Sequence, residues 1–214
     1  MISKLAADFA RAIEAVDAER PVAISSTTKR AYQAGIGPHT ETATLALVRA
    51  RLRAFDPTTY DEIETDVPYP EAPRQKCDWL WTLPTGEKFY IEAKMMRLMG
   101  DNGKPNDNIL SHILSPYPQQ RSALTDCQKL LNAGFAGTSA ILIYGYEYEG
   151  YPLKPVIRAF ETLASEVVSL SPASKTTFSG LVHPVHQQGA VYAWTISGTS
   201  RIEAMPSTYS PRLT

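Results

Sequence analysis

The stretch that most constrains the fold is KCDWLWTLPTGEKFYIEAKMM, residues 76–96. Two runs rich in aromatic and aliphatic side chains flank the turn sequence Pro-Thr-Gly, a pattern that predicts two antiparallel strands over 76–83 and 87–95. Because Asp78 and Glu92 lie equally far from the centre of this turn, the hairpin register should make them cross-strand neighbours. The sequence thus predicts two adjacent carboxylates inside a sheet.

Alternation along the second strand divides its side chains between two faces. Phe89, Ile91 and Ala93 should pack on a helix, while Glu92 and Lys94 project together from the other face. Adjacent carboxylates repel each other, so a cation must compensate them. Lys94 supplies one positive charge, and a divalent ion bound by hard oxygen ligands, Mg²⁺ or Mn²⁺, would supply two more. Two other interpretations remain open, namely an ion-pair network on an exposed sheet face and a solvated sheet edge.

The remaining pattern predicts a mixed α/β (α+β) fold, in which a central sheet is flanked by helices. Apolar residues at helical spacing and helix-capping signals predict helices that end near Glu19, begin near Thr40, and run over about 119–135 and 155–169. Further strands are expected over 59–69 and 138–148, and a terminal hairpin that turns at 187–189 is expected over 178–198. Pro68, Pro70 and Pro73 are expected to break the chain, and 100–118 is expected to form a long loop. We expect a single domain, 1–214, with a core over 38–170, an N-terminal helical extension over 1–37 and a C-terminal hairpin extension over 171–214.

Composition limits the function classes. Hydrophobic residues make up 43% and charged residues 20% of the chain, and the net charge is -1. These values favour a globular protein and exclude a strongly basic protein that wraps nucleic acid, but they allow an enzyme with a local basic groove. Cys77 and Cys127 belong to no CxxC pair, so we expect buried reduced thiols and no structural zinc. No signal peptide or membrane span is apparent, which predicts a soluble, cytoplasmic protein without a membrane partner.

The residues Asp78 … Glu92-Ala93-Lys94, in the element order helix, three strands, helix and strand, resemble the PD-(D/E)xK nuclease superfamily. The resemblance covers residues 38–145, about half of the chain, and Cys77 stands where the family name has proline. It implies a restriction-endonuclease-like core and a Mg²⁺ cofactor, for which Mn²⁺ can substitute. It also implies that Asp78, Glu92 and the backbone carbonyl of Ala93 hold the metal, with Glu41 contributed by the first core helix.

The activity implied by the resemblance is metal-dependent hydrolysis of phosphodiester bonds, in which Lys94 orients or helps deprotonate the attacking water. We therefore expect a Mg²⁺-dependent DNA endonuclease with a restriction or phage-defence role, without excluding RNA as substrate, and with a homodimer as one way to cut both strands. Gln119, Gln120, Arg121 and Arg97 are candidate phosphate contacts. The alternative is a non-catalytic nucleic-acid-binding or assembly module of the same fold.

Overall fold

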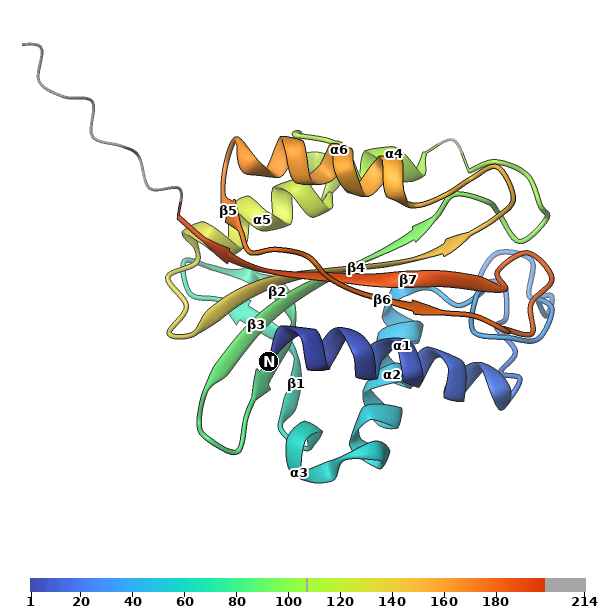
Figure 1. The fold of residues 1–214 in the computed structure, drawn as a ribbon, viewed down its shortest axis with the longest axis horizontal. Helices are drawn as coiled ribbons and strands as arrows, with labels where there is room; N and C mark the ends of the chain where they lie inside the picture. Colours follow the sequence, from blue (N-terminus) through green and yellow to red (C-terminus); the bar gives the residue numbers. More distant parts are fainter. Residues whose placement is uncertain (107, 199–214) are drawn as a thin grey trace, which may run out of the picture.

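The computed structural model describes residues 1–106 and 108–198, and it confirms the mixed α/β class. Within these ranges seven strands form one sheet in the order β1-β2-β3-β4-β7-β5, and β6 also pairs with β7. Only β3 and β4 run parallel, and every other pairing is antiparallel. Helices α1, α2 and α3 cover one face of the sheet, and α4, α5 and α6 cover the other (Figure 1).

Six α-helices, one 3₁₀ turn and seven strands lie within the described residues. The helices are α1 (Ile2–Ala18), α2 (Glu41–Phe55), α3 (Pro57–Tyr60), α4 (Ile109–Leu114), the 3₁₀ turn η1 (Pro118–Gln120), α5 (Ala123–Asn132) and α6 (Lys154–Ser165). The strands are β1 (Ile63–Tyr69), β2 (Ala72–Thr82), β3 (Lys88–Arg97), β4 (Thr138–Glu147), β5 (Ser169–Leu170), β6 (Ser174–Phe178) and β7 (Gln188–Ser197).

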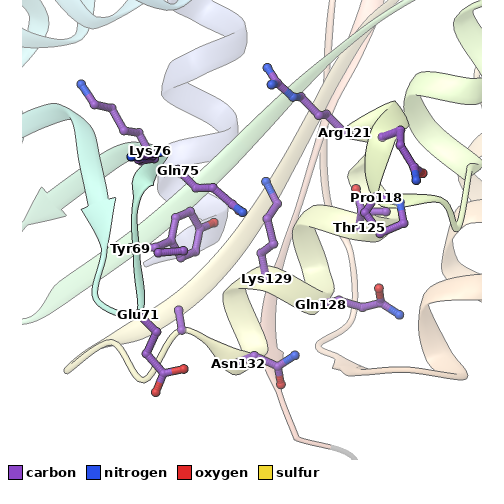
Figure 2. Close-up of a pocket in the computed structure, with 14 residues that line it drawn as sticks. Tyr69, Glu71, Gln75, Lys76, Pro118, Arg121, Thr125, Gln128, Lys129 and Asn132 are labelled. Carbon is purple, nitrogen blue, oxygen red and sulfur yellow. The ribbon is translucent and has the colours of Figure 1, made fainter.

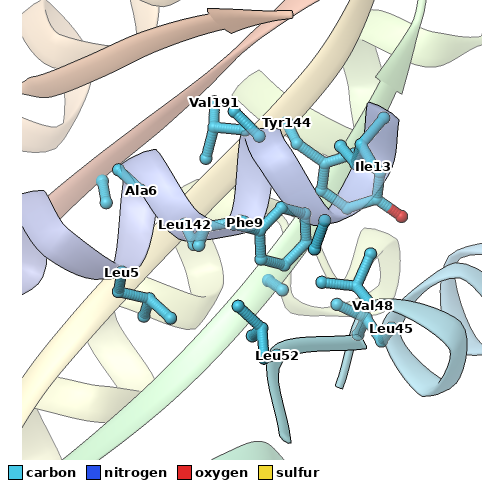
Figure 3. Packing of buried hydrophobic residues seen from close by; sticks show 14 of the residues in the cluster. Leu5, Ala6, Phe9, Ile13, Leu45, Val48, Leu52, Leu142, Tyr144 and Val191 are labelled. Atoms are coloured by element: carbon cyan, nitrogen blue, oxygen red, sulfur yellow. The ribbon is translucent and has the colours of Figure 1, made fainter. Parts of the chain in front are cut away.

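The first core layer lies between α1, α2 and the sheet. The apolar stripe of α1 is fully buried, as its helical spacing predicts, and Phe9 packs against both Trp79 and Tyr144. Leu45, Val48 and Leu52 of α2 are buried in the same cluster (Figure 3). On β3 this face carries Phe89, Ile91 and Ala93, so the predicted alternation is confirmed. Consequently, Glu92 and Lys94 point toward the α5 side of the sheet.

The second core layer lies between the sheet and α4, α5 and α6. It contains both cysteines, which are buried and free, as expected. The N-cap of α5 is Ser122, whose hydroxyl accepts a hydrogen bond from the Thr125 N–H and donates one to the Ser115 carbonyl. Gly134, at a positive φ of 61°, follows the end of α5 and stops the helix. These signals fix the start and end of the helix that covers the candidate site.

Of the three prolines expected to break the chain, only Pro70 does so. Pro68 lies inside β1 and Pro73 inside β2, and only Pro70 falls in the tight turn between the strands. β1 is the edge strand of the sheet, and an edge strand tolerates proline because one row of its N–H groups needs no partner. The register of the β1–β2 pairing shifts between Pro68 and Tyr69, next to the proline.

Three further expectations need correction. Residues 57–60 form the turn of helix α3, so the strand predicted over 59–69 begins only at Ile63. The predicted loop over 100–118 contains α4 and the start of η1. The terminal strands do pair, but residues 188 and 189 belong to β7 and do not form the turn.

Gly189 is required in β7 because a Cβ atom would stand 1.9 Å from the carbonyl oxygen of Gly145. The expected terminal extension also includes residues 199–214, which lie outside the described residues.

The feature that positions the site is a fork between β2 and β3. These strands pair only from Trp79↔Ile91 to Thr82↔Lys88. Asp78 and Glu92 are the next two positions in the same register, just where the pairing ends. Beyond this point β2 follows β1, while β3 follows β4 as far as Arg97. The fork exposes an unpaired stretch of the β3 backbone. Within the described ranges, no helix has the length and apolar character needed to cross a bilayer.

Candidate active site

Two carboxylates occupy the open edge of β3 at the fork. Asp78 accepts a hydrogen bond from the Ala93 N–H at 2.8 Å, and Glu41 accepts one from the Met95 N–H at 2.5 Å. Glu41 is the first residue of α2, whose N-cap is Thr40, so the helix start sets its position. These contacts satisfy backbone donors that would otherwise lack partners. Each carboxylate keeps a second oxygen for another ligand.

Glu92 projects from the face of β3 that α5 covers and is only 3% exposed. Its Oε1 accepts a hydrogen bond of 2.5 Å from the Tyr69 hydroxyl, and Lys129 Nζ approaches the same oxygen at 3.6 Å. Burial, together with the negative charge of Glu92, raises the pKa of Tyr69, which therefore remains a donor at neutral pH. The end of β1 and helix α5 thus clamp Glu92 from two sides.

Lys94 forms the most buried ion pair of the site. Its Nζ lies 2.6 Å from Asp126 Oδ2, and Asp126 also pairs with Lys129, one turn later on α5. Asp126 is completely buried, whereas the Lys94 and Lys129 side chains are 13% and 31% exposed. The Lys94 ammonium also donates to the Ala93 carbonyl at 3.4 Å. Although burial lowers the pKa of Lys94, the carboxylates of Asp126, Glu41 and Glu92 outweigh it and raise that pKa, so the ammonium stays charged.

The charges of this group do not balance. Burial raises the pKa of Glu92 well above its usual value, and the charges of Asp126 and Asp78 raise it further. Burial likewise raises the pKa of Glu41. The inner group contains four carboxylates (Glu41, Asp78, Glu92 and Asp126) and two ammonium groups (Lys94 and Lys129). Counted without Lys76, Arg97 and Arg121, which also line the cleft, this inner group lacks two positive charges when every member is ionised, which is the charge of one divalent cation.

All four carboxylates line one open cleft of about 670 Å³, together with Lys94 and Lys129. Asp78 and Glu92 thus face the same space, as the hairpin register predicts. Among the described residues, no three Asp, Glu, His or Cys side chains already converge on a metal-holding geometry. The donors suit a hard cation nevertheless, because free carboxylate oxygens and the Ala93 carbonyl lie along one edge of β3. The residues present therefore fit the group that the sequence resemblance implies.

The candidate phosphate contacts lie on the rim of this cleft. Gln119, Gln120 and Arg121 all line the cleft. The two glutamines belong to η1 and Arg121 follows it, so none of the three lies on α5 itself. Arg97 also lines the cleft, and its guanidinium is held by the Gly37 carbonyl at 2.9 Å and by Asp101 at 3.4 Å. Asp101 is fixed in turn by buried His186 at 2.9 Å. Arg97 is thus the most firmly positioned of these candidates.

Sequence reasoning missed three residues of the site, Tyr69, Asp126 and Lys129. A signal for Asp126 was present, since it falls on the apolar stripe of α5 between Ala123 and Leu130. A carboxylate on such a stripe needs a buried cationic partner. Tyr69 gave no comparable signal, because only the fold of the β1–β2 turn brings it to Glu92.

The chain matched no protein-family model, no curated protein and no solved structure. The family relationship suggested by the sequence therefore stays a prediction, and the site is interpreted from its own geometry.

The raised pKa of Glu92 predicts a pH-dependent stability. Because the folded-state pKa lies above the unfolded value of about 4.3, the stability present below that pH is lost as pH rises and the buried carboxyl ionises. We expect Glu92→Gln to unfold at a higher temperature than wild type at pH 7, with a difference that shrinks toward pH 4. Thermal unfolding across this range measures it. Exposed Glu149→Gln is the control, and an equal gain in that variant would contradict the assignment.

Proposed function

We propose that this protein is a metal-dependent nuclease that hydrolyses phosphodiester bonds of DNA. The observation that carries the proposal is the cluster of four carboxylates and two ammonium groups at the β2–β3 fork, two positive charges short and open to a cleft. Clusters of partly desolvated ionisable groups in a cleft are typical of functional sites. The resemblance of Asp78 … Glu92-Ala93-Lys94 to the PD-(D/E)xK superfamily supports the same interpretation.

Each residue has a distinct part in the proposed reaction. Asp78, Glu92, Glu41 and the Ala93 carbonyl would hold a divalent metal, whose chemistry is to lower the pKa of water and neutralise phosphate charge. Asp126 holds the Lys94 ammonium against the Ala93 carbonyl, beside the carboxylates. From there Lys94 orients a water and stabilises negative charge that develops on the phosphate. Tyr69 and Lys129 keep the Glu92 carboxylate in place.

A second candidate is a non-catalytic nucleic-acid-binding or assembly module. It is favoured by the hydrogen bonds that Asp78 and Glu41 accept from the Ala93 and Met95 N–H groups, which have no neighbouring strand to bond at the fork. This structural role of the two carboxylates needs no metal. This function would keep the basic rim of the cleft but would require no hydrolysis.

Cleavage assays distinguish the two candidates. Purified wild type is incubated with supercoiled plasmid, linear duplex, single-stranded DNA and RNA, in Mg²⁺, Mn²⁺ or EDTA. The nuclease proposal predicts cutting of at least one DNA substrate in Mg²⁺ or Mn²⁺ and none in EDTA. Nucleic-acid binding without cutting in either metal would favour the second candidate, and cutting that persists in EDTA would contradict the metal requirement. A restriction or phage-defence role further predicts endonucleolytic products from the plasmid.

A further inference from the structure

A second cavity, of about 900 Å³, adjoins the cleft between the β1–β2 hairpin and the η1–α5 segment. Four residues line both cavities, Lys76, Gln119, Arg121 and Lys129, so the two spaces form one continuous path. We call this second cavity the groove, and its lining includes Tyr69, Arg74, Gln75, Lys76, Gln128 and Asn132. A polymer that is cut at the carboxylate cluster can continue along this path.

The charge of the groove is predominantly positive. Arg74, Lys76, Arg121 and Lys129 line it, against a single carboxylate, Glu71. Lys129 is paired with Glu92 and Asp126, but within 1–106 and 108–198 no carboxylate lies at ion-pair distance from Arg74, Lys76 or Arg121. Cations without partners in a concave site attract an anionic ligand. Figure 2 shows Lys76 and Arg121 on opposite walls, with Lys129 between them.

The backbone of Arg121 adds an independent observation. This residue is the C-cap of η1 and has φ 48° and ψ 46°, a left-handed conformation. At the junction of groove and cleft it places a guanidinium, the group best suited to grip phosphate with two hydrogen bonds.

The size and lining of the groove narrow the ligand class. Its volume falls within the range of about 300–1,000 Å³ typical of small-ligand pockets. A cavity of this volume is too small to enclose a duplex, whose major groove alone is about 12 Å wide. The only aromatic ring in the lining is Tyr69, which packs on Phe135 and points its hydroxyl at Glu92, so no ring is left free for stacking bases. Side-chain amides such as Gln75, Gln128 and Asn132 can bond phosphates and base edges without strong sequence preference.

We propose that the groove binds the single-stranded portion of the nucleic acid that flanks the cleaved phosphate. The inference rests on the proposed nuclease function and adds the substrate class. It implies that the preferred substrate is single-stranded or carries a single-stranded segment, held mainly through its phosphates.

Arg74 gives the sharpest test, because it lines the groove but not the cleft. Binding of fluorescent oligothymidylate, oligouridylate and a blunt duplex is measured by anisotropy in EDTA, with wild type, Arg74→Glu and Arg158→Glu. Arg158 is an exposed residue of α6 that lines neither cavity and serves as the matched control. We expect a single strand to bind more tightly than the duplex, and Arg74→Glu to lose about tenfold in affinity with a shallower salt dependence, while Arg158→Glu binds as wild type. The difference in affinity between oligothymidylate and oligouridylate shows whether the groove prefers a DNA or an RNA backbone.

A second readout separates this inference from the proposed function. Bis(p-nitrophenyl) phosphate is too small to reach the groove, so Arg74→Glu should hydrolyse it at the wild-type rate while losing activity on single strands through a higher KM. Equal single-strand affinity in Arg74→Glu and Arg158→Glu, or tighter binding of the duplex, would overturn the groove assignment even if the small ester is hydrolysed. Weakened strand binding in Arg74→Glu, without hydrolysis of any substrate, would leave the groove in place and remove the nuclease.

Discussion

Replacing Lys94 with methionine should lower cleavage of DNA by at least about 10²-fold, because the ammonium that orients water and offsets phosphate charge is removed. Methionine keeps an apolar stem of similar length, which limits the packing loss in a side chain that is only 13% exposed. The rate is measured under single-turnover conditions in Mg²⁺ with the best substrate found for wild type. Because the groove is untouched, oligonucleotide affinity in EDTA should change little.

Lys88→Met is the matched control for this variant. Lys88 begins the same strand, β3, but is exposed and lies outside the cleft. It should cleave at the wild-type rate. If Lys94→Met is folded at the assay temperature and still cuts within about threefold of wild type, Lys94 is not part of the reaction.

Asp126→Ala should destabilise the protein by about 3–5 kcal/mol, the largest stability effect we expect at the site. Asp126 is fully buried and pairs with both Lys94 and Lys129, so its removal leaves the Lys94 charge without its nearest partner inside the protein. Urea unfolding measures the free-energy change from the shift in midpoint.

A double variant tests the stated cause of that loss. In Asp126→Leu/Lys94→Met both buried charges are removed together, so we expect much of the stability to return, while Lys129 can reach solvent. Catalysis should not return, since Lys94 is absent. If the double variant is less stable than Asp126→Ala, the loss comes from packing and not from an unpaired charge.

Local patterns were enough to predict the hairpin at the centre of the site. The alternation of Phe89 and Ile91 with Tyr90 and Glu92 gave the correct faces of β3, and equal spacing from the Pro-Thr-Gly turn gave the correct neighbour for Asp78. Both signals depend only on residues close in sequence. Glu41 was linked to the site only by the family resemblance, and the structure places it at the β3 edge.

The rest depended on contacts between distant segments. Pro68 is accommodated because β1 is an edge strand, and Pro73 lies on the part of β2 that does not pair with β3, neither of which local sequence reveals. The fork between β2 and β3 leaves donors that Asp78 and Glu41 satisfy, and Asp126 reaches Lys94 across the sheet-to-helix layer. Electrostatic balance is a property of this whole assembly, so neither strand alone could indicate the charge deficit.

A calorimetric titration with Mg²⁺ and Mn²⁺ at pH 8 tests whether the carboxylate cluster takes one divalent cation. Wild type is compared with Asp78→Asn and Glu92→Gln, and exposed Glu149→Gln is the control. We expect saturable binding by wild type and Glu149→Gln, accompanied by a higher unfolding temperature, with affinity reduced at least about tenfold in the two site variants. Absence of binding in wild type, or equal binding in all four proteins, would contradict it.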